Sequence, residues 1–197
     1  MSDKSSSDTW SDKIDMRITQ YRYFKEHNER ILEAEALMEQ ALKQGHKILV
    51  FGNGGSATQA AHFAAELVNK FYFKRKALPA IALTTDTACI TSIANDMDYK
   101  YVFSRQVEAL GTPGDVAVGL TTSGKSPNVL EALRQAREMG LKTIALCGQY
   151  TADMETTGID VITPVLCGDT PTIQELHLFI LHAWAEALEL HFRGGDR

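Results

Sequence analysis

The first part of the chain carries apolar residues at helical spacing over residues 13–44. They recur about every three or four positions, which predicts an amphipathic helix or a pair of helices. Gly45 follows as a stop, and the polar pair His27-Asn28 could divide the segment in two. Residues 1–12 are rich in Ser and Asp and have no apolar core, so we expect a disordered polar tail there.

Beyond residue 45, short continuous apolar runs alternate with helical segments. The runs lie at residues 47–51, 79–84, 116–121, 142–147 and, more weakly, 160–165. The helical segments lie at 56–69, at 87–110 with a break, at 127–139 and at 171–192. A continuous apolar run indicates a strand that is buried on both faces. The pattern therefore predicts an α/β fold, with a doubly wound five-stranded parallel sheet flanked by helices. We expect residues 13–197 to form one domain, which includes an N-terminal helical extension.

Two of these helices have marked starts. Ser126 precedes Pro127 and Thr170 precedes Pro171, so each start has a hydroxyl side chain at the N-cap position and a proline in the first turn. Each start follows a predicted strand and falls at the carboxyl edge of the sheet. That edge is where doubly wound proteins bind their ligands.

Two loops at this edge could contact a ligand. The segment 121–126 reads Thr-Thr-Ser-Gly-Lys-Ser, and its hydroxyl groups, with the free N–H groups of a helix start, favour a phosphate. The spacing is not that of a P-loop, and Ser126 could be only a helix cap in a polar turn. The segment Gly52-Asn53-Gly54-Gly55-Ser56 could approach a ligand closely or form only a tight turn.

Candidate acid–base groups lie on two helices. His62 and Glu66 are four residues apart and share a helix face, so they could move protons, bind a metal together or form a surface pair. The last helix carries Gln174 and His182 among apolar residues. These two residues are about 12 Å apart along a straight helix, so their spacing alone does not indicate a metal site.

Two further polar segments carry weaker signals. Asn95-Asp96, at the predicted end of a short helix, could hydrogen-bond sugar hydroxyls, although turn chemistry is the simpler explanation. The basic run 74–76 lies beside the aromatic run 71–73. In an acidic chain, a run of this length indicates a solvated edge rather than a nucleic-acid site.

The composition of the chain argues against several classes of function. The 197 residues include 20 Lys and Arg and 25 Asp and Glu, a formal net charge of −5, so no overall field attracts nucleic acid or an anionic membrane. The three cysteines form no C-x-x-C pair, which indicates reduced thiols in the cytoplasm. The N-terminus does not read as a signal peptide, and no apolar run approaches the ~18 residues of a membrane span.

Taken in order, these motifs resemble those of the sugar isomerase (SIS) domain family. The matching segments are 52–56, 62–66, 94–96, 103–107, 121–126 and 173–177, together with His182. They extend over nearly the whole chain, and the ordered set is far more specific than any single motif.

The resemblance implies a cytoplasmic homotetramer with active sites near the subunit interfaces. It implies conversion of sedoheptulose 7-phosphate to D-glycero-D-manno-heptose 7-phosphate, the first step toward ADP- or GDP-heptose for lipopolysaccharide or capsule. By motif, the substrate contacts would be Asn53, Gly54, Gly55, Glu66, Asn95, Asp96, Thr121, Thr122, Ser123, Ser126 and Gln174. Many members bind one zinc ion per site, and the ligands here would be His62, Glu66, Gln174 and His182.

An aldose–ketose isomerisation through an enediol needs a base near C1 and an acid near the C2 oxygen. We assign Glu66 as the base and His182 as the acid. One alternative is a non-catalytic relative that binds the bacterial replication initiator, and the presence of both groups disfavours it. Another alternative is an isomerase of a different sugar phosphate, because the sequence does not show the shape of the pocket.

Overall fold

The computed structural model describes residues 6–193, and a five-stranded parallel sheet forms its centre. The strands are β1 (Ile48–Gly52), β2 (Ala80–Ala82), β3 (Val116–Thr121), β4 (Lys142–Cys147) and β5 (Val161–Pro164). Their order is β2-β1-β3-β4-β5, and every neighbouring pair is parallel. The predicted doubly wound sheet is therefore confirmed. The order of the strands reverses between β1 and β3, which is the position where such sheets bind ligands.

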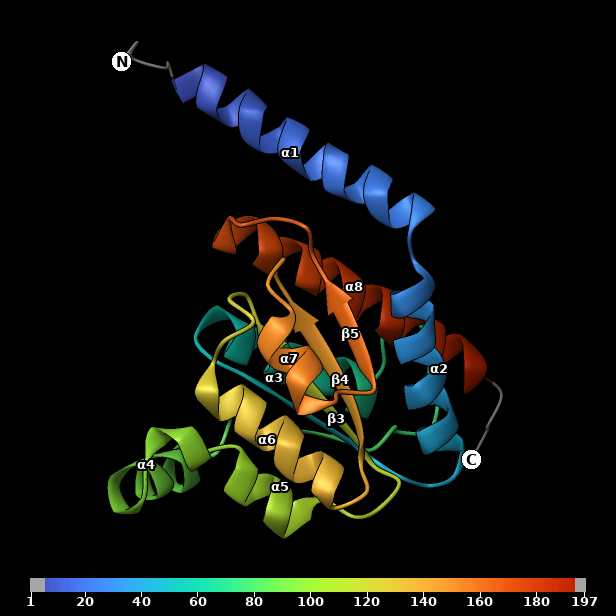
Figure 1. Cartoon of the computed structure of the whole chain (residues 1–197). Helices are drawn as coiled ribbons and strands as arrows, with labels where there is room; N and C mark the ends of the chain where they lie inside the picture. Colours follow the sequence, from blue (N-terminus) through green and yellow to red (C-terminus); the bar gives the residue numbers. More distant parts are fainter. Residues whose placement is uncertain (1–5, 194–197) are drawn as a thin grey trace.

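Helices cover both faces of the sheet and create two cores (Figure 1). One face carries α2 (Glu29–Lys43), α3 (Gly55–Val68) and α8 (Thr170–His191). The other carries α4 (Thr87–Asp96), a 3₁₀ turn (Tyr99–Tyr101), α5 (Ser104–Leu110), α6 (Pro127–Glu138) and α7 (Ala152–Thr157).

Strand β1 shows why its sequence is apolar without a break. Ile48 and Val50 belong to the core under α3 and α8, whereas Leu49 and Phe51 belong to the core under α5 and α6. Successive side chains on a strand point to opposite faces, so a strand that is covered on both sides needs apolar residues throughout.

The N-terminal region forms two helices, α1 (Ser6–Glu26) and α2, which are separated at the predicted break. Gly45 follows α2 with a φ of +84°, as a helix stop does. The predicted tail is wrong for residues 6–12, because α1 begins at Ser6. Ser and Asp are favourable at a helix start, so a polar segment can be a first turn that the apolar pattern misses. Residues 1–5 lie outside the described residues.

Helix α8 begins differently from the prediction. Its N-cap is Asp169, whose carboxylate accepts the Thr172 N–H at 3.1 Å, while Thr170 and Pro171 are the first two helical residues. An acidic side chain caps a helix as well as a hydroxyl does, so the N-cap is residue 169 instead of the predicted residue 170. No helix within residues 6–193 has the length and apolar character needed to cross a bilayer.

Candidate active site

The two predicted ligand loops lie side by side at the switch point of the sheet. One follows β1, the other follows β3, and the two strands are neighbours with Gly52 opposite Leu120. A Cβ placed on Gly52 would lie 2.9 Å from the Leu120 carbonyl oxygen, so glycine allows this close approach.

Hydroxyl side chains hold the loop after β3 together. Thr121 Oγ1 lies 2.9 Å from Ser126 Oγ and 3.3 Å from Ser123 Oγ, and Ser123 Oγ accepts the Lys125 N–H at 3.1 Å. Gly124 has a φ of +71°, and a Cβ there would lie 1.9 Å from the Tyr150 carbonyl oxygen. Only glycine fits this position, which brings the loop against the segment after β4.

Ser126 occupies the N-cap position of α6, as predicted, but its side chain makes no capping hydrogen bond there. Its hydroxyl contacts Thr121 instead. Pro127 has no N–H group, and the Val129 and Leu130 N–H groups donate to the Ser126 carbonyl oxygen at 3.1 and 3.0 Å, so the start of α6 could offer an anion the Asn128 N–H together with the positive end of the helix dipole. A cavity of 230 Å³ adjoins this loop, and Thr122 and Ser123 are among its lining residues.

Asn53, in the loop after β1, is fixed by a residue that the sequence did not single out. Its amide and that of Asn128, on α6, exchange two hydrogen bonds of 2.8 Å each, and the Tyr99 hydroxyl donates to Asn53 Oδ1 at 3.2 Å. These two hydrogen bonds connect the glycine-rich loop after β1 to α6, the helix that follows the hydroxyl loop. The only available signal was that Asn128 follows the Ser126-Pro127 helix start.

Gly55, the first residue of α3, lies directly against Gln174 of α8. A Cβ on Gly55 would be 2.6 Å from Gln174 Nε2, and Gln59 Nε2 donates to the Gln174 carbonyl oxygen at 2.6 Å. Gln174 therefore lies at the glycine-rich loop, and its predicted contacts with substrate and zinc stay predictions. Gly54, just before the helix, has a φ of +55°.

His62, Glu66 and His182 form a cluster between α3 and α8. His62 Nε2 lies 2.8 Å from His182 Nε2 and 3.4 Å from Glu66 Oε1. The two imidazole rings meet edge to face, with centroids 5.0 Å apart. The predicted base and acid are thus brought together, with His62 in contact with both. A hollow of 300 Å³ lies beside His62.

The environment of the cluster favours neutral imidazole at His182. Burial lowers the pKa of His182 below its usual value, and the neighbouring His62 lowers it further, while the Glu66 carboxylate opposes both effects. A neutral imidazole has one N–H donor and one free nitrogen, so it can both give and accept a proton.

Asn95 and Asp96 lie at the end of α4, where both are exposed. Asn95 Nδ2 donates to Asp96 Oδ1 at 2.8 Å, so the contact that the structure gives these two side chains is with each other. The nearby Tyr99 supplies a link from this segment to Asn53. Their predicted contact with substrate stays a prediction.

The predicted zinc ligands offer suitable donor atoms, since imidazole nitrogen and carboxylate oxygen are common zinc ligands. Within residues 6–193, however, no group of three or more His, Cys, Asp and Glu side chains is placed to hold a metal ion. The His62–His182 contact also requires an N–H on one of the two Nε2 atoms, and that proton would have to leave or move before both could bind zinc.

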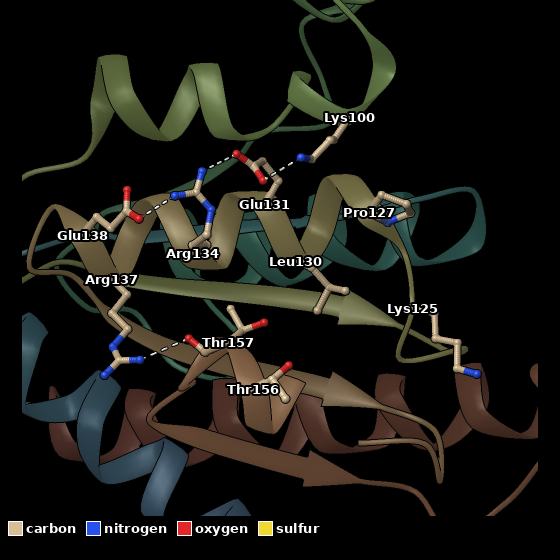
Figure 2. A pocket seen from close by; sticks show the side chains of 10 residues that line it. All are labelled: Lys100, Lys125, Pro127, Leu130, Glu131, Arg134, Arg137, Glu138, Thr156 and Thr157. Atoms are coloured by element: carbon tan, nitrogen blue, oxygen red, sulfur yellow. Dashed lines mark hydrogen bonds and ion pairs between the residues drawn. The ribbon is translucent and has the colours of Figure 1, made fainter. Parts of the chain in front are cut away.

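A cavity of 730 Å³ lies along α6, where Lys125 of the hydroxyl loop and Pro127 are among its lining residues (Figure 2). Its charged residues are largely paired, because Arg134 bonds to Glu131 and Glu138, and Lys100 lies 3.1 Å from Glu131. The Arg137 side chain donates to the Thr157 carbonyl oxygen at 3.1 Å. None of the predicted site residues lines this cavity.

Comparisons with known proteins agree with this architecture. Residues 10–148 match the SIS domain family. The chain is 47% identical over 173 residues to the phosphoheptose isomerase of Geotalea daltonii, covering 88% of this chain and 90% of that protein. It is 52% identical over 149 residues to that of Paramagnetospirillum magneticum, covering 76% and 77%.

Solved structures give the same result. The phosphoheptose isomerase of Neisseria gonorrhoeae aligns with a TM-score of 0.86 at 38% identity, covering 94% of this chain and 100% of that chain. That of Francisella tularensis aligns with a TM-score of 0.89 at 34% identity, covering 95% and 100%. This chain therefore belongs to the SIS domain family.

Proposed function

We propose that this chain is an aldose–ketose isomerase that converts sedoheptulose 7-phosphate to D-glycero-D-manno-heptose 7-phosphate. The observation that carries the proposal is the contact of Glu66 and His182 through His62, in a chain whose β1 and β3 loops form a hydroxyl-lined cradle. Relatives named phosphoheptose isomerase match most of its length. They disfavour the alternative of a non-catalytic replication-initiator-binding protein.

The phosphate end of the substrate would be held by the loop 121–126. The Thr121 hydroxyl contacts those of Ser123 and Ser126, and the Ser126 side chain makes no capping hydrogen bond to α6. Such a site binds an anion through local hydroxyl and N–H donors, so it does not depend on the overall charge of the chain, which is −5. Holding the remote phosphate would position C1 and C2 for proton transfer.

The proton transfers would be carried out by Glu66 and His182. In the ketose-to-aldose direction, the Glu66 carboxylate takes a proton from C1, the C1–C2 enediol forms, and the carbon that was C2 regains a proton. His182 moves the proton between the C1 and C2 oxygens, for which its neutral imidazole has one donor and one acceptor. General acid–base catalysis of this kind contributes about 10²–10⁴-fold per group.

We also propose a zinc site made by His62, Glu66 and His182, with Gln174 as a fourth ligand. Donor chemistry supports it, since His62 contacts His182 through ring nitrogen atoms and Glu66 through a carboxylate oxygen atom. Bound zinc would polarise an oxygen of the substrate as a Lewis acid. A carboxylate that binds zinc is a weaker base, so the two roles of Glu66 compete.

A cytoplasmic homotetramer is proposed as the working form. Free cysteines at positions 89, 147 and 167 are consistent with a reducing compartment. Several apolar side chains of α1 are exposed in the single chain, among them Trp10, Ile14 and Ile18, and a second copy could cover them. In a bacterial cell, the heptose product would enter the synthesis of lipopolysaccharide or capsule.

The decisive experiment is incubation of the protein with sedoheptulose 7-phosphate, with and without a chelator, followed by NMR of the sugar product. Glu66→Gln and His182→Ala should each reduce turnover by at least about 10²-fold, because each removes one proton-transfer group. His191→Ala is the matched control, since His191 also lies on α8 beside a carboxylate, at 3.0 Å from Glu39. Turnover within about tenfold of the unmodified protein in either site variant would contradict the assignment.

A further inference from the structure

The segment between α3 and β2 is more ordered than its sequence indicates. It contains the aromatic run 71–73 and the basic run 74–76, for which we expected a solvated edge. That expectation is wrong for Arg75, whose side chain has an exposure of 0%. Its partner is Glu189 of α8, with an exposure of 1%. A buried ion pair is costly unless its remaining hydrogen-bonding groups are also satisfied.

Glu189 binds the backbone of the aromatic run. Its carboxylate oxygens accept the N–H groups of Phe71 at 2.8 Å, Tyr72 at 2.5 Å and Phe73 at 2.9 Å. Burial raises the pKa of Glu189, but the three N–H donors and Arg75 outweigh that effect, so the pKa lies below its usual value. An ionised carboxylate therefore fixes three consecutive residues of the segment.

Arg75 binds the end of α3, the helix that carries Glu66. Its guanidinium donates from Nη2 to the Glu66 carbonyl oxygen and from Nη1 to the Leu67 carbonyl oxygen, each at 2.8 Å. The last carbonyl groups of a helix have no partner within the helix, so Arg75 supplies donors that α3 lacks. Its Nε lies 3.4 Å from Glu189 Oε1. The pair thus joins α8 to the backbone of the proposed base.

The other end of the anchored segment contacts the proposed acid. The Phe71 ring lies 5.6 Å from the His182 ring, centroid to centroid, while the Phe71 N–H is bound by Glu189. One buried carboxylate therefore fixes the residue that packs on His182, and its arginine partner fixes the helix end that carries Glu66.

We propose that Arg75 and Glu189 are positioning residues that hold Glu66 and His182 in register for proton transfer. This inference rests on the proposed function of the Glu66–His62–His182 cluster. It places the two residues outside contact with substrate, since each acts through backbone groups and through Phe71.

The test compares two buried carboxylates with similar structural roles. Asp115, with an exposure of 1%, accepts the N–H groups of Lys47 and Thr112 and pairs with the Lys47 ammonium, at the start of β3 and so at the amino edge of the sheet. Asp115→Asn is therefore the matched control for Glu189→Gln. Both variants should lower the thermal midpoint, because each removes the charge of a buried carboxylate that accepts several N–H groups.

Turnover is divided by the number of phosphate-binding sites, counted by calorimetric titration with inorganic phosphate, so that unfolded protein is not mistaken for slow chemistry. We expect Glu189→Gln to lower kcat per site by about tenfold or more with KM within about twofold, because the phosphate loop is unchanged. Asp115→Asn should keep kcat per site within about twofold. Equal kcat per site in Glu189→Gln and the unmodified protein would overturn the inference, as would equal losses in the two variants.

A second readout does not depend on turnover. If Glu189 holds Phe71 against His182, then Glu189→Gln should speed carbethoxylation of His182 by diethyl pyrocarbonate by at least about threefold, measured by peptide mass spectrometry, and Asp115→Asn should not. An unmodified protein without isomerase activity would contradict the proposed function, whereas an unchanged rate at His182 in Glu189→Gln would contradict this inference.

Should Glu189→Gln fail to fold, Phe71→Leu tests the same link with the buried pair left intact. It removes the ring contact with His182, and we expect a smaller loss of kcat per site, about threefold, with KM within about twofold. A kcat per site equal to that of the unmodified protein would mean that the anchored segment does not position His182.

Discussion

Individual hydroxyl groups distinguish the β3 loop from an ordinary helix start. Thr121 lies within hydrogen-bonding distance of both Ser123 and Ser126, so the side chains support one another rather than the helix that follows. A serine at an N-cap normally stabilises its helix by about 1 kcal/mol through a bond from the side chain to an N–H group. Ser126 makes no such bond, so its substitution separates binding from stability.

Ser126→Ala should raise KM for the sugar phosphate by about tenfold or more and change kcat little, because a hydrogen bond to a charged phosphate is lost while the reacting carbons stay in place. The thermal midpoint should fall only slightly. Steady-state kinetics and calorimetry measure the two effects. Ser104→Ala, at the start of α5, is the control for losing a hydrogen-bonded serine hydroxyl outside the two ligand loops. An unchanged KM in Ser126→Ala would remove the hydroxyl from the phosphate site.

At the scale of elements, polar side chains link helices to strands and to other helices, and the apolar pattern of the sequence does not show which partner each side chain will contact. His177 and His182 are five residues apart on α8, yet they face different partners. His182 meets His62 of α3, whereas His177 is buried and its Nε2–H donates to the carbonyl oxygen of Cys147, the last residue of β4, at 3.2 Å. Only His182 belongs to the candidate site.

Burial lowers the pKa of His177 to about 4, against a usual value of 6.5. As the pH falls from 6.5 to about 4, His177 binds a proton in the unfolded chain but not in the folded chain, so the free energy of unfolding decreases. The loss attributable to His177 is about 3 kcal/mol once the pH is near 4. In urea titrations at a series of pH values, His177→Gln should lose less stability than the unmodified protein between about pH 6.5 and pH 4. Parallel losses in the two proteins would contradict this account.

The elements themselves could largely be predicted from the sequence. The apolar run at 116–121 coincides with β3, because a strand covered on both faces needs apolar residues at every position. Contacts between elements could not. Gly55 meets Gln174, and Arg75 meets Glu189, across more than a hundred residues of chain, and no local period indicates which positions will meet. The zinc and catalytic sets came from the family resemblance, since helical spacing left them open.

At the scale of the whole molecule, α1 uses one side to contact the body of the protein. Arg17 pairs with Glu175 near the start of α8, and the Tyr21 ring meets the Phe179 ring at 5.0 Å. Figure 1 shows the N-terminal part of α1 extending beyond the remainder of the protein. Trp10, Ile14 and Ile18 are spaced by four residues and are exposed by 68%, 43% and 41%. They form a single apolar stripe.

A stripe of this kind is costly to leave in water, so we expect a second copy of the chain to cover it in the proposed tetramer. Replacing Ile14 and Ile18 together by Glu should dissociate the assembly into smaller species with intact helical content, measured by sedimentation velocity and circular dichroism. Thr19→Glu adds charge to another face of α1, where Thr19 bonds only to Asp15 of its own helix, and should leave the assembly unchanged. If the doubly substituted chain kept the sedimentation coefficient of the unmodified protein, the stripe would not be the subunit interface.

If the proposed active sites also lie near these interfaces, dissociation should lower turnover together with assembly, whereas equal turnover in dissociated protein would place each site within one chain.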